Sequence, residues 1–147
     1  MTAEDFTETY SLNVLAVILL TKAILPHLDT KSRIINIGSV GGRAGFPELS
    51  LYCSSKAALE GLTRSWAAEL GPDGHTVNCV NPGPVQTELL EGVPSAIIEK
   101  QKESTPAEKR MGTVEDIAGV VGFLAEGDRS RWITGQVISA SGGWAMY

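Results

Sequence analysis

The 147-residue chain has little of several features that mark specialised classes of protein. It has two cysteines, Cys53 and Cys79, whose separation matches no metal-binding or redox motif, so we expect reduced thiols and no metal site. The net charge is −5 and no lysine or arginine cluster reverses that sign, which argues against nucleic-acid binding. His27 and His75 have no partner pattern and are interpreted as structural.

Long hydrophobic runs are also missing. The longest, residues 14–20 (VLAVILL), is far shorter than the ~20 residues that cross a bilayer. Acidic residues precede it, where a secretory signal would be basic. We therefore expect no membrane segment, assign the run to a helix buried on several sides, and expect a cytoplasmic protein.

The rest of the composition is that of one globular domain, with 43% hydrophobic and 20% charged residues. Thr2 and Thr113 are placed to cap helices. Helices are predicted over residues 2–28, 50–70 and 113–124, with one or two more between 87 and 109, and strands over residues 33–38, 75–80 and 136–140. This alternation predicts an α/β fold with a small parallel sheet of about three strands and flanking helices.

The stretch YCSSK suggests proton-transfer chemistry. Tyr52 and Lys56 stand four residues apart, so on a helix they share one face. A free tyrosine has a pKa near ~10, and a nearby cation favours the phenolate, so the pair could exchange a proton near neutral pH. A YxxxK match arises by chance in ~one in ten such chains, so the motif alone is weak.

Three further features fall where parallel strands end, or inside an apolar helix. Ser39 follows the strand 33–38, where ligands bind in open α/β sheets, although a turn serine would look the same. Asn13 is polar within an apolar helix, so it binds something: a functional partner, or nearby backbone or water. Residues 81–87 (NPGPVQT) follow another strand and form either a ligand-facing turn or a plain connector.

Together these residues resemble the short-chain dehydrogenase/reductase (SDR) family. Asn13, Ser39, Tyr52 and Lys56 have the order and spacing of its Asn-Ser-Tyr-Lys tetrad, with Ser39 thirteen residues before Tyr52. The resemblance covers nearly the whole chain, which would form a single partial Rossmann-like, doubly wound domain over residues 1–147. It extends over the blocks IINIGS, YCSSKAALEGLTRSWAAELG, VNCVNPGPVQT, RMGTVEDIAGVVGFLA and ITGQVISASGG.

The resemblance implies a role for each site residue. Tyr52 would be the general acid/base, Lys56 would assist it and bind the nicotinamide ribose, and Ser39 would orient the substrate carbonyl. Asn13 would hold a water that relays protons to Lys56. The nicotinamide of NAD(P)(H), with NADP slightly favoured, would lie against four further residues: Pro82, Gly83, Val85 and Thr87. The reaction would be hydride transfer between this cofactor and a small-molecule carbonyl or alcohol.

The glycine-rich TGxxxGxG turn that holds the cofactor pyrophosphate in this family does not occur in the sequence. By analogy roughly four of seven strands are missing. We therefore expect poor dinucleotide affinity, an unpaired edge at residues 33–38, and a marginally stable or self-associating chain.

Other expectations concern substrate and partners. Residues 88–110 would form the substrate lid, and Leu89, Leu90, Val93, Ile97 and Ile98 make it partly apolar. That fits a hydrophobic carbonyl compound, but a lid helix packing on the core would look identical. Helices 2–28 and 50–70 would form a homo-oligomer interface. The alternative function is a non-catalytic fragment or dimerisation module without cofactor binding.

Overall fold

The computed structural model describes residues 1–147, apart from the side chain of Leu89. Short π or 3₁₀ turns (η1 to η5) lie between the main elements, and the chain order is as follows: α1 (Ala3–Tyr10), η1 (Ser11–Leu15), α2 (Ala16–Ile24), η2 (Leu25–His27), β1 (Arg33–Ile37), η3 (Val40–Gly42), α3 (Ser50–Leu70), η4 (Gly71–Asp73), β2 (Thr76–Pro82), η5 (Glu88–Leu90), α4 (Ser95–Ser104), α5 (Val114–Ala125) and β3 (Val137–Ala140).

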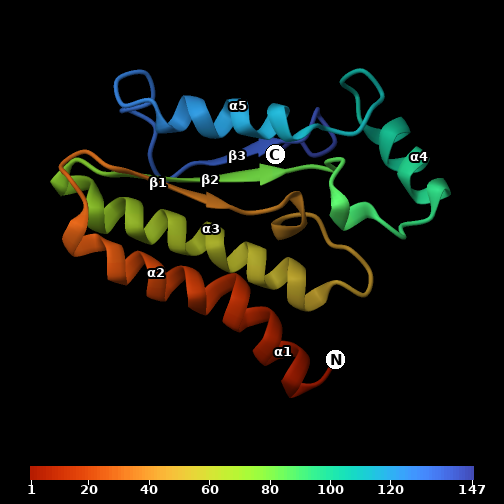
Figure 1. The fold of residues 1–147 in the computed structure, drawn as a ribbon, viewed down its shortest axis with the longest axis horizontal. Coiled ribbons are helices and arrows are strands. Elements are labelled where there is room, and N and C mark those ends of the chain that lie inside the picture. Colours follow the sequence, from red (N-terminus) through yellow and green to blue (C-terminus); the bar gives the residue numbers. More distant parts are fainter.

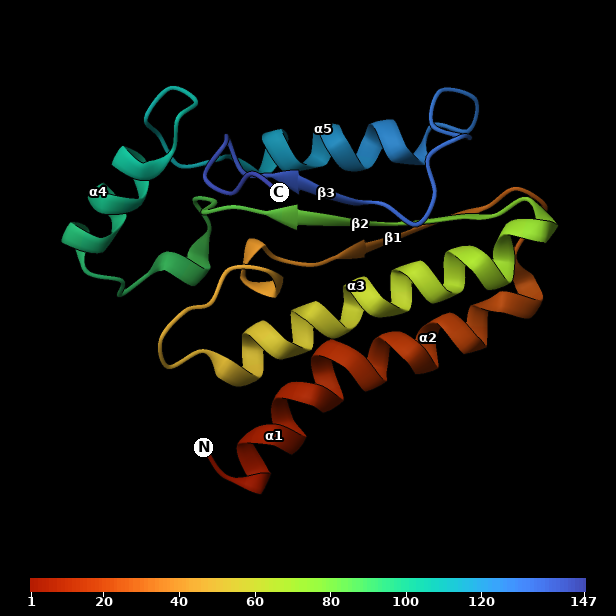
Figure 2. The same ribbon diagram turned by 180° about the vertical axis from the view of Figure 1, so that it is seen from behind.

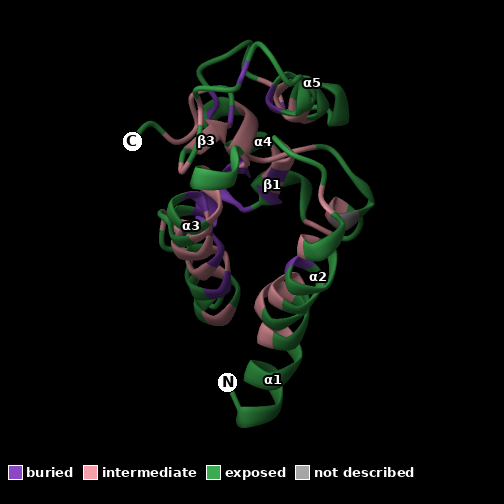
Figure 3. Ribbon diagram, turned by 90° about the vertical axis from the view of Figure 1, so that its left-hand side faces the viewer, coloured by how far each residue is buried: buried purple, intermediate pink, exposed green. Residues whose placement is uncertain are grey.

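The three strands form one parallel sheet in the order β1-β2-β3. Helix α5 covers one face, while α3 lies on the other face with α1 and α2 beside it (Figures 1 to 3). Helices on both faces explain why the strands are apolar runs rather than alternating sequences. The predicted α/β class, with three parallel strands and flanking helices, is confirmed.

The central strand β2 is buried along almost its whole length. Val77 packs with Ile34 and Ala67 in a core that Leu28, Trp66 and Leu70 border. The strand also runs further than predicted, because Asn81 and Pro82 pair with Ser139 and Ala140. A proline is tolerated there because it ends the strand, and the next donor, Gly83 N–H, bonds to Ala140 O at 3.0 Å.

The N-terminal helical run begins as predicted. The Thr2 side chain and Asp5 form a reciprocal capping box that satisfies the first turn. The run then passes through the π-helical turn η1, which carries Asn13, before α2 continues. Capping residues are therefore readable from sequence, whereas the extra residue of a π turn is not.

The expectation that this run is buried is wrong. Within α1, η1 and α2, Thr21 alone is buried among the described residues, and Leu12 is 73% exposed. Figure 3 shows α1 and α2 as a mostly exposed arm beside α3. Helix α1 and the turn η1 contact α3, whereas a groove separates α2 from β1, so many apolar residues of this run remain exposed in the described chain.

Residues 3–27, taken as one helix, form a longer apolar segment than the expectation of no membrane segment assumed. The run has 25 residues, its most apolar window has a mean hydropathy of 1.5, and 6% of that window is buried. By length and composition alone it is long enough to cross a bilayer, which the single seven-residue run did not indicate. A core helix whose cover lies elsewhere has the same composition.

Candidate active site

The predicted site residues gather at one edge of the sheet. All three strands are parallel, so their carboxyl ends point the same way, towards α4 in Figure 1. Ser39 follows β1, residues 83–87 follow β2, and the first turn of α3 carries Tyr52. Ligands bind at this edge in open α/β sheets.

Tyr52 and Lys56 are adjacent on α3. The Lys56 ammonium nitrogen lies 5.8 Å from the centre of the Tyr52 ring and donates a 3.0 Å hydrogen bond to Ile37 O at the end of β1. Burial lowers the pKa of Lys56 from its ordinary value. Tyr52 itself is 36% exposed, so its ring is accessible to a ligand.

Ser39 is held so that its hydroxyl proton is available. Its backbone N–H donates to Asn81 Oδ1 at 3.1 Å, and its Oγ accepts from Gly41 N–H at 3.0 Å. Because a hydroxyl has one proton and two lone pairs, Oγ can still donate towards another oxygen. The following turn packs tightly on α3: a Cβ at Gly42 would stand 3.2 Å from the backbone of Lys56 and Ala57.

Asn13 is tied to the same helix. Its Nδ2 donates to Ser55 Oγ at 3.0 Å, and the Ser55 hydroxyl donates to Tyr52 O at 2.7 Å. Asn13 and Lys56 also line one groove of about 450 Å³ between α2 and β1. The structure therefore brings Asn13 to the Tyr52–Lys56 turn and identifies the partner of this half-buried amide.

The residues predicted to meet the nicotinamide lie just beyond β2. A Cβ at Gly83 would stand 2.7 Å from Ser141 Cβ, so glycine permits the close approach of the β2 and β3 ends. Val85 pairs with Gly112 through hydrogen bonds made by Pro84 O and Gln86 N–H. This pattern turns the N–H and C=O of Val85 to the opposite side. The Thr87 side chain makes no capping bond to η5.

Residues 88–110, the expected lid, contain η5 and α4. Together with residues 86, 87 and 111 they enclose a groove of about 440 Å³, lined by polar and apolar side chains that include Thr87, Leu90, Ile98 and Met111. The prediction that Leu89 gives the lid an apolar side chain lies outside the described residues. Ile97 is 49% exposed, so α4 does not bury all of its apolar side chains against the core.

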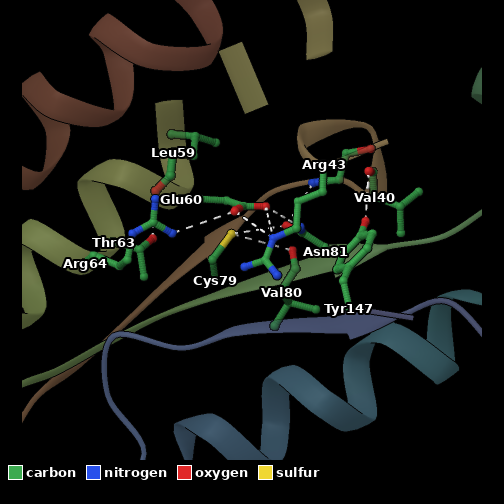
Figure 4. Close-up of polar contacts among 11 residues, drawn as sticks. Val40, Arg43, Leu59, Glu60, Thr63, Arg64, Cys79, Val80, Asn81 and Tyr147 are labelled. Carbon is green, nitrogen blue, oxygen red and sulfur yellow. Dashed lines mark hydrogen bonds and ion pairs between the residues drawn. The ribbon is translucent and has the colours of Figure 1, made fainter. Parts of the chain in front are cut away.

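Sequence reasoning missed a buried polar network behind Ser39. Glu60, 5% exposed, accepts hydrogen bonds from Asn81 Nδ2 at 2.7 Å and from Arg43 Nε at 2.9 Å (Figure 4). Tyr147 OH in turn donates to Val40 O at 3.0 Å. The available signal was spacing. Lys56, Glu60 and Thr63 recur at helical intervals along α3, and two asparagines, Asn78 and Asn81, interrupt a buried strand.

Cys79 lies within this network and is not a reactive thiol. Burial, reinforced by the Glu60 charge, raises the pKa of Cys79 to about 11. The protonated thiol contacts Asn81 Oδ1 at 3.4 Å. The other cysteine, Cys53, is half-buried, and neither thiol forms a disulfide in the described chain.

A parallel sheet covered by helices on both faces, with its polar residues at the carboxyl edge, defines the Rossmann-like class of α/β folds. The family model described as enoyl-(acyl carrier protein) reductase matches residues 1–145. The chain belongs to the short-chain dehydrogenase/reductase family.

Relatives and solved structures agree with this membership. The chain is 46% identical to Dehydrogenase OXI1 of Cochliobolus heterostrophus over 95% of its length, and 38% identical to L-2,3-butanediol dehydrogenase of Corynebacterium glutamicum over 97%. A short-chain dehydrogenase/reductase of the glucose/ribitol dehydrogenase type from Brucella melitensis superposes on all of it, with a TM-score of 0.94 and 31% identity.

The chain covers 62% and 60% of those two relatives and 59% of that structure, so it spans about three fifths of their length. Because the superposition includes the N-terminal helical run, α1 and α2 are helices of the α/β fold.

Proposed function

We propose that this chain carries the catalytic half of an NAD(P)-dependent oxidoreductase that acts on a carbonyl or alcohol substrate. The observation that carries the proposal is the fixed position of Lys56, whose ammonium group lies beside the Tyr52 ring while bonding to β1 two residues before Ser39. Tyrosine, lysine and serine are thereby gathered at the ligand-binding edge of the sheet.

Each residue then has one task. Tyr52 gives its phenolic proton to the carbonyl oxygen during reduction, or takes it from the alcohol during oxidation. Lys56 stabilises the phenolate that results, and Ser39 donates its free hydroxyl proton to the substrate oxygen. Asn13 holds the Tyr52 turn through Ser55 and faces the groove that Lys56 lines, where it can hold a water that returns protons to Lys56.

The residues present fit the nicotinamide end of NAD(P)(H). Val85 offers a free N–H and C=O suited to a carboxamide, Gly83 leaves room for a ring at the strand ends, and Lys56 can reach a ribose hydroxyl. When bound, the cofactor supplies or accepts the hydride. The sequence holds no TGxxxGxG turn for the pyrophosphate, so we expect weak dinucleotide binding.

The substrate class follows from the groove beside Thr87. Its apolar side chains, Leu90, Ile98 and Met111, suit a hydrophobic carbonyl compound, and η5 with α4 would act as the lid. The relatives named above, a 2,3-butanediol dehydrogenase among them, support small alcohol or carbonyl substrates. The free thiols of Cys53 and Cys79 support a reducing compartment such as the cytoplasm.

A second candidate function is a dimerisation module without turnover. The exposed apolar residues of α1 and α2 favour it, because such a surface is covered in a stable assembly. A second copy, or a longer relative, would pack against α1, α2 and α3.

Turnover of a hydrophobic diketone at high NADPH concentration tests the first proposal. Tyr52→Phe should lower the rate about 100-fold or more, because it removes the proton donor. Tyr10→Phe is the matched control: Tyr10 bonds to Ser54 on the same helix turn but holds no proposed role, so its rate should change little. Equal rates in Tyr52→Phe and wild type would contradict the proposal, and a folded chain without turnover would favour the dimerisation module.

A further inference from the structure

Glu60 is a buried carboxylate with no part in the chemistry described above. It lies one turn beyond Lys56 on α3, 5% exposed, and accepts hydrogen bonds from Asn81 and Arg43, with Arg64 further away at 3.8 Å. Burying a charge is unfavourable unless it is paired and hydrogen-bonded, and Glu60 meets both conditions. Its two close partners, Asn81 and Arg43, are each connected to the turn that begins at Ser39.

The first connection passes through the Asn81 side chain, which is fully buried. A carboxylate can only accept, so the Asn81 amide must turn its NH₂ group towards Glu60, at 2.7 Å. The amide oxygen then faces the other way, where it accepts the Ser39 N–H at 3.1 Å and the Cys79 thiol at 3.4 Å. The charge of Glu60 therefore sets the orientation of the amide that holds the Ser39 backbone.

The second connection passes through Arg43, four residues after Ser39. Its Nε donates to both Glu60 oxygens, at 2.9 and 3.2 Å, and its guanidinium lies 5.0 Å from the centre of the Tyr147 ring. Tyr147 OH bonds to Val40 O, so the C-terminal residue closes over the same turn (Figure 4). One carboxylate thus anchors the Ser39 turn at its start and at its end.

We propose that Glu60 is a positioning residue for Ser39, acting through Asn81 and Arg43 without touching the substrate. The inference rests on the role proposed above for the Ser39 hydroxyl. Lys56 and Tyr52 are fixed separately, by Ile37 O and by Ser55, so the network should govern the serine and leave the tyrosine–lysine pair in place.

Amide hydrogen exchange of the ¹⁵N-labelled 147-residue chain, followed by NMR, tests the proposal without cofactor. Arg43→Gln removes the tie between the turn and Glu60, and should speed exchange of the Ser39, Gly41 and Gly42 amides about tenfold or more. Arg64→Gln is the matched control, because Arg64 also lies near Glu60 but belongs to α3 itself and not to the Ser39 turn. In this variant the exchange rates of the same amides should change by less than about twofold.

Glu60→Gln is the second variant and should loosen the same three amides while the β2 amides keep their protection. Equal effects of Arg43→Gln and Arg64→Gln, an unchanged turn, or uniform acceleration across the sheet would overturn the proposal, since a merely structural pair acts on the whole fold. The readout needs no bound nicotinamide, so failure of cofactor binding would contradict the proposed function and leave this result standing.

Discussion

The inner side of α3 and the outer side of α1 and α2 reverse the usual relation between polarity and burial. Behind Ser39, the space between α3 and the sheet is polar and buried, filled by Glu60, Asn81 and Thr63. The outer face of the N-terminal helices is apolar and exposed, with Leu15 and Leu19 towards solvent. Buried polar groups and exposed apolar patches are the informative exceptions in a fold.

The buried polar region bears on the candidate site, and the exposed apolar region bears on assembly. The buried polar groups are hydrogen-bonded within the chain, and they adjoin the candidate site, which indicates that they serve its geometry. The apolar helix face is exposed in the described chain, as the proposed dimerisation module requires. Variants in each region test this division.

Asn81→Leu should have the largest effect. It removes the acceptor of Ser39 N–H and the closest donor to a buried carboxylate, which should lower the free energy of unfolding by about 3 kcal/mol. Denaturant unfolding measures this change. A loss below about 1 kcal/mol would mean that water enters the network freely and that the region is not a closed polar core.

Cys79 should make the same region sensitive to alkali. Its folded pKa, about 11, lies above the ordinary value of 9.0. The unfolded chain therefore loses this proton first, and stability that is fully present below pH 9.0 falls as the pH rises towards about 11, by on the order of 2 kcal/mol.

Urea unfolding at about pH 8 and about pH 10.5 checks this expectation. Cys79→Ala should weaken the alkaline loss, whereas Cys53→Ala, the matched control at a half-buried position, should retain it. An alkaline loss that is the same in all three proteins would assign it to other groups.

The outer face should give the smallest change in stability. Leu15→Gln and Leu19→Gln replace exposed side chains and should alter the free energy of unfolding by less than about 0.5 kcal/mol. They should nevertheless reduce self-association, measured by analytical ultracentrifugation over a range of concentrations. A large loss of stability, or a wild-type chain that stays a monodisperse monomer of high melting temperature, would break the comparison.

Much of the fold was readable from the sequence. The bounds of α3, the helix caps at Thr2 and Thr113 and the three parallel strands follow from periodicity, caps and glycine stops. The π turn at Asn13 and the exposure of α2 were not, because an extra residue in a helix has no sequence signature and because burial depends on which neighbours are present.

The candidate site divides in the same way. Asn13, Ser39, Tyr52 and Lys56 form an ordered motif along the sequence, so they could be chosen before the fold was known. Glu60 and Asn81 could not be paired, because their contact depends on how α3 lies across β2 and on which way an amide turns. Long-range polar contacts of this kind require the three-dimensional arrangement.

We propose that this chain holds the nicotinamide half of a dehydrogenase site. A fluorescence titration with NADPH, NADH and reduced nicotinamide mononucleotide tests it most directly, with Lys56→Ala as the control. We predict weak, saturable binding that is similar for all three ligands within about threefold and is weakened by Lys56→Ala, because only the nicotinamide end finds partners. No binding by the folded chain, or binding that Lys56→Ala leaves unchanged, would contradict the account.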